Sequence, residues 1–349
     1  MPARLASVTI QSISSLRKSD QAETGSPSES ALPVSIRTDL DGRFTVNNVK
    51  PGKYVVVAWL PGYLSPLASL ATKTDKFGGP ADGFSRGLEQ LVPTVIVESN
   101  QTSSVDIELE RGAEISGTID YDDGGPVVGA EVQLLQQIQH EQWRLVPLSN
   151  SLVTFKNGNT DDRGNFRLVG VPPGQYIVSA TLPLQTFWGA AIDRGSVQYA
   201  MPRTLDGKLE VYSGNTFRRN AATPIKVSPG ENRPGTDITI PLSKLHHIAG
   251  VLTAASDGHV LRSGLVELLY ADDMSTVQRV RADDDGTFLI NFVPNGDYLL
   301  KVQGGALDND GDMKTQSPAS QSRNKLYKSL EIPVTVQGDI NNLVITLSQ

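Results

Sequence analysis

A 21-residue pattern occurs three times in this chain at a constant spacing of 122 residues, in residues 38–58, 160–180 and 282–302. Self-similarity at a fixed period is typical of tandem modules rather than of one large domain. The same residue types recur at five places in the pattern: Gly42, Gly164 and Gly286; Phe44, Phe166 and Phe288; Val49, Val171 and Val293; Gly52, Gly174 and Gly296; Tyr54, Tyr176 and Tyr298.

The residue order inside each copy indicates two β-strands and two turns. Asp-x-x-Gly favours a tight turn, because the aspartate accepts from nearby amides and glycine tolerates a positive φ. Phe-x-Val then alternates with the period of a half-buried strand. A Pro-Gly or Asn-Gly turn follows, and Tyr begins a second alternating strand. We expect Phe and Tyr to lie on neighbouring antiparallel strands and to meet on the buried face.

Shorter repeated segments surround each copy and raise the expected number of strands to about seven per module. The opening strand is 114–119 or 247–252, the second strand is 129–134 or 263–268, and two closing strands end near residues 109, 240 and 347. Seven strands with regular turn spacing predict a sandwich. The expected modules are 1–111, 112–244 with a long insert at 184–223, and 245–349.

The first module departs from this plan. Residues 5–10 match 129–134, so the opening strand has no counterpart in the first module. The chain is then either a fragment of a longer array or a protein whose first sandwich has an open edge. An unpaired edge promotes association with other chains.

Composition supports an all-β protein and excludes several function classes. The chain has 32 glycines and 21 prolines, which suits short strands joined by turns. It has no cysteine, which removes thiol catalysis, disulfides and thiolate metal sites. The net charge of −7 argues against a nucleic-acid partner. No apolar run reaches the length of a membrane-spanning helix, and residues 1–13 do not have the pattern of a signal peptide.

The repeats resemble the carboxypeptidase regulatory-like domain family. The resemblance is carried by Pro126-Val-Val-Gly-Ala-Glu-Val132, Thr160-Asp-Asp-Arg-Gly-Asn-Phe166 and Val171-Pro-Pro-Gly-Gln-Tyr176, with fewer identities in the other two copies. It implies tandem Greek-key sandwiches of the transthyretin-like type, a fold also grouped with carbohydrate-binding-like folds. Such modules are common in exported bacterial proteins and outer-membrane receptors, and the resemblance confers no peptidase activity.

Three catalytic chemistries are not expected from this sequence. The four histidines, His140, His246, His247 and His259, do not begin a zinc-peptidase motif. Related pilin-type modules form a Lys–Asn crosslink with a glutamate four residues after the repeat tyrosine, where this chain has Ala58, Ala180 and Val302. A Gly-x-Ser-x-Gly motif is also missing from the sequence. We therefore expect no enzyme activity.

Two groups of side chains are candidates for ligand binding. Exposed aromatics stack on sugar rings, and long loops often carry function. The candidates are Trp143 and, in the insert, Phe187, Trp188, Tyr199 and Tyr212. These aromatics could instead pack the insert onto its sandwich. Asp308, Asp310 and Asp312 resemble the start of a calcium loop, although the twelfth position is Ala319 rather than glutamate. The other interpretation of this segment is a polar turn.

The sequence predicts a non-catalytic, exported bacterial repeat protein that acts as a structural or interaction module, with carbohydrate or protein as the ligand. An alternative is an accessory region of a larger outer-membrane receptor or peptidase. A third interpretation, a small-molecule transport dimer, would need open edges that pair across a two-fold axis. No cofactor other than calcium is expected.

Overall fold

The computed structural model describes residues 1–15, 33–65, 89–139, 142–146, 158–184, 190–193, 196–199, 204–262, 264–303, 305–306 and 326–349. They form two compact units. Unit 1 comprises Met1–Ile119, Pro126–Ala180 and Tyr212–Ile238, and unit 2 comprises Asp120–Gly125, Thr181–Val211 and Thr239–Gln349. Strands dominate both units, and the helical segments of the described ranges are short: residues 13–15, residues 89–91, and the 3-10 helices η3 (Arg219–Ala221) and η4 (Leu242–Lys244). The protein is therefore an all-β protein, as the sequence predicts.

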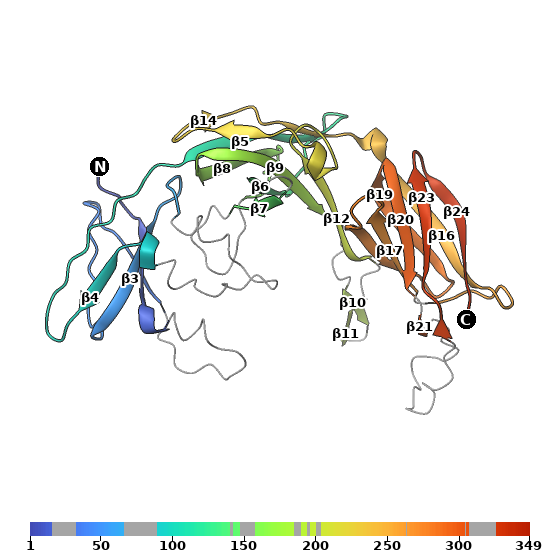
Figure 1. Cartoon of the computed structure of the whole chain (residues 1–349), viewed down its shortest axis with the longest axis horizontal. Coiled ribbons are helices and arrows are strands. Elements are labelled where there is room, and N and C mark those ends of the chain that lie inside the picture. The colour runs from blue at the N-terminus through green and yellow to red at the C-terminus, as the bar shows by residue number, and fades with distance from the viewer. Residues whose placement is uncertain are drawn as a thin grey trace, which may run out of the picture. The chain divides into compact units, whose positions relative to one another are not determined.

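The first repeat contains one four-stranded antiparallel sheet in the order β2-β1-β3-β4 (Figure 1). Alternation along β1 and β3 turns Val8, Ile10, Val56 and Ala58 toward one face, where they form a core cluster. The strands are β1 (Ser7–Ser12), β2 (Val34–Arg37), β3 (Gly52–Trp59) and β4 (Thr94–Val97).

The second repeat has the same first sheet and adds a second one. Its first sheet contains β7, β6 and β9 in that order, with β13 paired to β9, and its second sheet places β5 between β8 and β15. The short strand β14 pairs with β5 in parallel. The strands are β5 (Ala113–Tyr121), β6 (Glu131–Gln139), β7 (Gln142–Leu145), β8 (Asn165–Val171), β9 (Gly174–Pro183), β13 (Ile225–Val227), β14 (Asn232–Arg233) and β15 (Ile238–Ile240).

The third repeat, which belongs to unit 2, shows both sheets in full. One sheet has the order β18-β17-β20-β23 and the other β19-β16-β24, with β24 parallel to β16. Their facing sides enclose a core that includes Phe288 and Tyr298. The strands are β16 (Leu245–Ala254), β17 (Leu265–Tyr270), β18 (Thr276–Arg281), β19 (Thr287–Pro294), β20 (Gly296–Gln303), β21 (Gly305–Ala306), β22 (Leu326–Tyr327), β23 (Leu330–Val336) and β24 (Ile340–Leu347). The pair β21–β22 forms a small sheet of its own.

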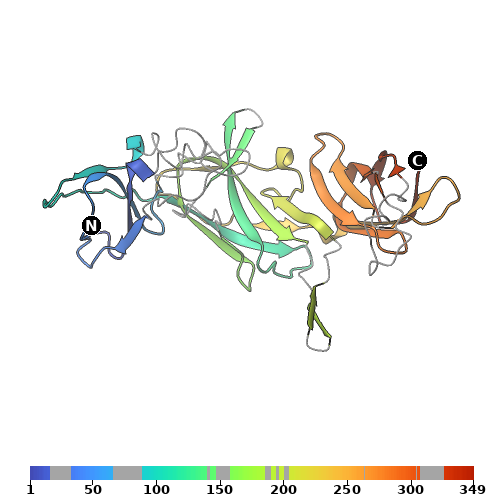
Figure 2. The same cartoon turned by 90° about the horizontal axis from the view of Figure 1, so that it is seen from below.

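The insert at 184–223 is not a single loop. It contains β10 (Ala190–Asp193) and β11 (Ser196–Tyr199), which form the isolated two-stranded ribbon drawn in olive in Figure 2, and β12 (Thr204–Tyr212). Strand β12 pairs antiparallel with β18, so it extends a sheet of unit 2.

The two strands of each repeated pattern do not pair with each other, which corrects the expectation for Phe and Tyr. Strand β8 pairs with β5, whereas β9 pairs with β6 and β13, so the intervening turn carries the chain from one sheet to the other. The repeat tyrosine closes this corner, because its hydroxyl donates to the carbonyl oxygen four residues earlier. The three bonds are Tyr54 to Lys50 at 2.9 Å, Tyr176 to Pro172 at 2.7 Å and Tyr298 to Pro294 at 2.7 Å. Tyr298 stacks instead on Tyr270, with ring centroids 5.3 Å apart.

The Asp-x-x-Gly turns form as the sequence predicts. Gly42, Gly164 and Gly286 have φ angles of 76°, 75° and 74°. The Oδ1 atom of Asp161 accepts from the amides of Arg163 and Asn165 at 2.9 and 2.8 Å, and Asp39 accepts from residues 41 and 43 at 2.9 and 2.8 Å. The same local chemistry therefore sets the same turn in separate repeats.

Candidate functional site

The three repeats differ in their second sheet, and this difference defines the candidate site. In the second repeat β5 lies between β8 and β15, and in the third repeat β16 lies between β19 and β24. The corresponding segments of the first repeat are residues 44–49 and 105–109, and neither pairs with any described strand. Figure 1 draws the connection from β4 to β5, which contains 105–109, as a long coil. We call 44–49 and 105–109 the acceptor edges.

The acceptor edges keep an inward apolar face. Their aromatic and aliphatic side chains pack against the core of the first sheet; these side chains are Phe44, Val46, Val49, Val105, Ile107 and Leu109. All six are only half-buried. Most of the equivalent residues of the other repeats are buried: Phe166 and Phe288 are 3% and 4% exposed, and Ile238 and Ile345 are 1% and 0% exposed. Leu343, the counterpart of Val105, is itself half-buried. The first repeat therefore has the side chains of a complete sandwich, but no strand among its described residues covers them.

An edge of this kind can bind an extended peptide. The peptide adds main-chain hydrogen bonds to the edge, and its alternate side chains enter the apolar face. Sequence reasoning indicated the missing strand because residues 5–10 match the second strand, 129–134, and no earlier segment matches the opening strand. It did not identify the half-buried side chains, because burial depends on which segments lie next to one another in space.

Unit 1 also contains a pocket of about 430 Å³ with mainly aliphatic walls, lined in part by Ile107 and Leu109 of the acceptor edges. Its polar lining includes Arg144 and Gln136, whose side chains are joined by a 2.6 Å hydrogen bond from the guanidinium to Oε1. The Nε atom of Arg144 is buried without a hydrogen-bond partner. Burial lowers the pKa of Arg144 below its ordinary value, and burial raises the pKa of Tyr176 to about 12 against the opposing effect of the Arg144 charge.

The predicted aromatic ligand residues do not assemble into one surface among the described side chains. Trp143 is half-buried on β7, where it lies opposite Gln137. Tyr212 ends β12 and is 5% exposed, so its ring belongs to the core rather than to an open stacking surface. Tyr199 lies on β11, and nothing further is described of its side chain. Phe187 and Trp188 fall outside the described residues.

The predicted cation ligands Asp308, Asp310 and Asp312 also fall outside the described residues. Within the described ranges, no group of three or more acidic or histidine side chains could hold a metal ion. The nearest arrangement joins two neighbouring histidines to one carboxylate: His247 Nδ1 lies 3.2 Å and His246 Nδ1 lies 3.6 Å from Asp339 Oδ1. A further chain of contacts links Asp257, His259 and Tyr327. Both groups of contacts, the one around Asp339 and the one around His259, connect a residue in a loop to a residue in a β-strand.

No described helix has both the length and the apolar character that crossing a bilayer would need.

Comparisons with known proteins find similar solved structures but no similar sequence family. Neither a protein-family model nor a curated protein matches the sequence. Among solved structures, the chain is similar to the Bacillus anthracis TIE protein, with 14% identity, a TM-score of 0.23 and coverage of 100% of this chain and 48% of that one. It thus spans about half the length of that protein.

Two further solved structures show the range of the similarity. A streptococcal ancillary pilin has 12% identity and a TM-score of 0.34, with coverage of 100% of this chain and 94% of that one. The 5-hydroxyisourate hydrolase of Klebsiella pneumoniae has 16% identity and a TM-score of 0.21, over 30% of this chain and 89% of that one. The all-β architecture of this chain rests on its own sheets.

Proposed function

We propose that this chain is a non-catalytic interaction protein, and that its first repeat binds an extended segment of a partner polypeptide by β-strand addition. One observation carries the proposal: six apolar side chains on the acceptor edges are half-buried, whereas most of their counterparts in the other repeats are buried. Contact between apolar groups and water is unfavourable, so a partner that covers these half-buried side chains is stabilised by the burial. Unpaired strand edges supply main-chain donors and acceptors for the same partner.

The remaining repeats would serve as a scaffold for this binding edge. Their turns, corners and cores are complete, and the same hydrogen bonds recur in each of them. Rigid scaffolds that present one binding edge are a common use of β-sandwich domains. The resemblance to regulatory-like modules supports an exported bacterial protein or an accessory region of a larger receptor or peptidase.

An array of nine-residue peptides tests the proposed function. Peptides with alternating apolar residues should bind the full chain, and peptides with polar residues at the same places should not. Ile107→Lys should abolish binding, because it puts a charge on the acceptor edge. Val128→Lys is the matched control, since Val128 is 63% exposed and lies outside the acceptor edges. Binding that survives Ile107→Lys, or no peptide binding at all, contradicts the proposal.

A carbohydrate ligand is a second candidate, favoured by the half-exposed indole of Trp143 on β7. An aromatic ring at a sheet edge can stack on a sugar face. Binding of the chain to a glycan array that disappears on Trp143→Ala would support this candidate. Glycan binding unchanged by Trp143→Ala would remove this residue from it.

A further inference from the structure

We propose that the strand bound by the acceptor edges has the pattern apolar-x-Gly-x-apolar and lies with its glycine opposite Phe44. This inference rests on the proposed function and specifies the partner. The second and third repeats of the same chain contain the corresponding strand, and they provide the template for the first repeat.

The register of the bound strand follows from the complete repeats. In the second repeat Gly117 lies opposite Phe166 and Ile115 opposite Leu168. In the third repeat Gly250 lies opposite Phe288, and Ile248 lies opposite Ile290. These partners are 122 and 244 residues after Phe44 and Val46. A strand in the first repeat would therefore run antiparallel to 44–49, with an apolar residue opposite Val46 and the next inward position opposite Phe44.

The position opposite Phe44 requires glycine for a steric reason. A Cβ atom on Gly250 would lie 2.7 Å from Cζ of Phe288 and would also collide with the carbonyl oxygen of Leu343. A Cβ atom on Gly117 would collide with the carbonyl oxygen of Thr236. Side chains do not approach ring or backbone atoms this closely without a shift of the structure. The contact that both glycines share is a carbonyl oxygen of the closing strand, and the counterpart of Thr236 and Leu343 in the first repeat is Val105. Phe44 is the counterpart of Phe288, so its ring adds a second restriction on the incoming strand.

The flanking apolar positions follow from burial. Ile115 and Ile119 flank the glycine of β5, and Ile248 and Leu252 flank the glycine of β16. All four side chains are 0% exposed. In the third repeat Leu252 lies beside Ile345 of the parallel strand β24, the counterpart of Ile107. The incoming strand would therefore place its second apolar residue next to Ile107.

The outward positions of the strand are less restricted. In the second repeat Glu114 of β5 forms a two-pronged ion pair with Arg167 of β8, at 2.7 and 2.6 Å. The counterpart of Arg167 in the first repeat is Thr45, which carries no charge. Selection by the first repeat should therefore depend on the Ile-x-Gly-x-Ile or Ile-x-Gly-x-Leu pattern and not on a carboxylate at the position of Glu114.

The experiment uses the full chain carrying Val46→Cys, whose thiol is unique because the natural sequence has no cysteine. The probes are a synthetic peptide of residues 113–121 and the same peptide with Gly117→Val. We expect the first peptide to slow alkylation of the thiol and to protect the amides of 44–49 and 105–109 from hydrogen exchange. We expect the valine peptide to bind at least ten-fold more weakly.

A second variant distinguishes steric selection of glycine from non-specific binding of apolar peptides. Phe44→Ala removes the ring but keeps the backbone carbonyl of Val105, so both peptides should bind more weakly while the glycine peptide still binds more tightly than the valine peptide. Equal binding of both peptides to the natural Phe44 chain, or protection that maps to the edges of β2 or β4, overturns the inference. If other peptides from the array bind at the acceptor edges and neither of these two peptides does, the proposed function stands. Only the apolar-x-Gly-x-apolar pattern of the bound strand is then wrong.

Discussion

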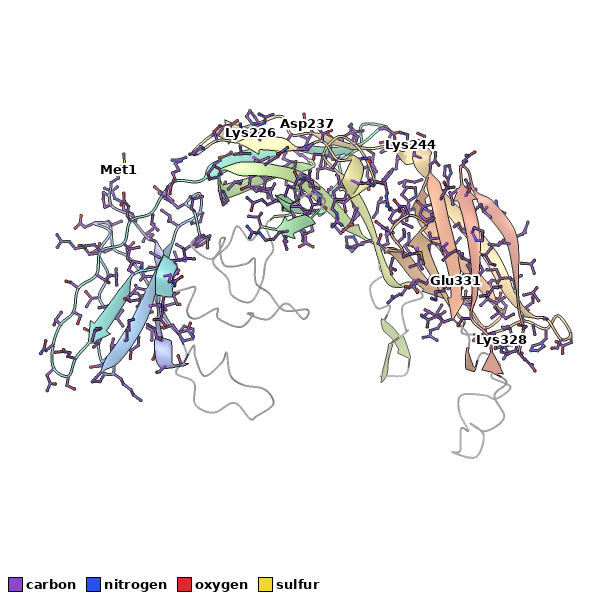
Figure 3. The ribbon with its side chains drawn as sticks, in the orientation of Figure 1. Met1, Lys226, Asp237, Lys244, Lys328 and Glu331 are labelled. Carbon is purple, nitrogen blue, oxygen red and sulfur yellow. The ribbon has the colours of Figure 1, made fainter. Side chains whose placement is uncertain are left out.

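The carboxylate of Glu267 accepts two hydrogen bonds from Arg279 on the neighbouring strand, from Nε at 2.7 Å and from a terminal nitrogen at 2.6 Å. Its side chain is 8% exposed. The pair belongs to a row across unit 2 in which Lys301 lies opposite Glu267 and pairs with Glu331 at 2.9 Å; Glu331 is labelled in Figure 3. Alternating charges thus cross β18, β17, β20 and β23 in register.

Removing the arginine of this pair, whose carboxylate is buried and whose guanidinium side chain is exposed, should destabilise unit 2. Arg279→Met leaves a carboxylate with little access to water, and we expect the free energy of unfolding to fall by about 2 kcal/mol. The double variant Glu267→Met with Arg279→Met should recover part of the loss, because no unpaired charge remains. Urea unfolding of the single and double variants measures both effects. A double variant that is less stable than Arg279→Met contradicts this interpretation.

The corner tyrosines predict a graded loss of stability. Tyr176→Phe leaves the carbonyl of Pro172 without its donor in a buried corner, which should cost about 1–3 kcal/mol in the free energy of unfolding. Tyr54→Phe should cost less, because Tyr54 is half-buried and water can reach the carbonyl of Lys50. Equal losses in thermal or urea unfolding would show that burial does not set the strength of this bond.

Alkaline pH should weaken the fold through Tyr176. Its pKa is raised to about 12, chiefly by burial, from the ordinary value of 10.0. The unfolded chain therefore ionises first, so the stabilising contribution is complete below pH 10 and is lost as the pH rises toward 12. Unfolding free energies measured across this interval should fall less steeply in Tyr176→Phe than in the natural chain. Identical slopes for the two chains would rule out this residue as the cause.

The turn glycines predict a position-specific cost of adding a methyl group. Gly164→Ala forces alanine into a φ of 75°, which should destabilise the fold by about 1 kcal/mol or more. Gly338 is the control, because no atom lies within 4 Å of a Cβ built there and its φ is not in the left-handed region. Gly338→Ala should leave the melting temperature unchanged or slightly higher. A melting temperature that drops equally in both variants would argue against the φ explanation.

Interactions between residues close together in the sequence allowed most of the turns and strands of the repeats to be predicted. Asp161 and Gly164 define a turn through bonds within five residues, and alternating apolar residues define the strands on either side. The repeat spacing placed the same elements three times and showed that residues 5–10 correspond to the second strand of the other repeats. These features depend on neighbours along the chain, so the sequence carries them directly.

The sheet to which each strand belongs was decided only in three dimensions. Phe166 and Tyr176 are ten residues apart and looked like members of one hairpin, yet their strands pair with β5 and β6. The corner that separates them depends on a hydroxyl-to-carbonyl bond and on burial from both sheets. In the same way, Phe44 has the sequence signature of a core residue, but its exposure is set by a strand that no described segment supplies. Periodicity specifies which face of a strand is apolar, whereas only tertiary packing specifies what covers that face.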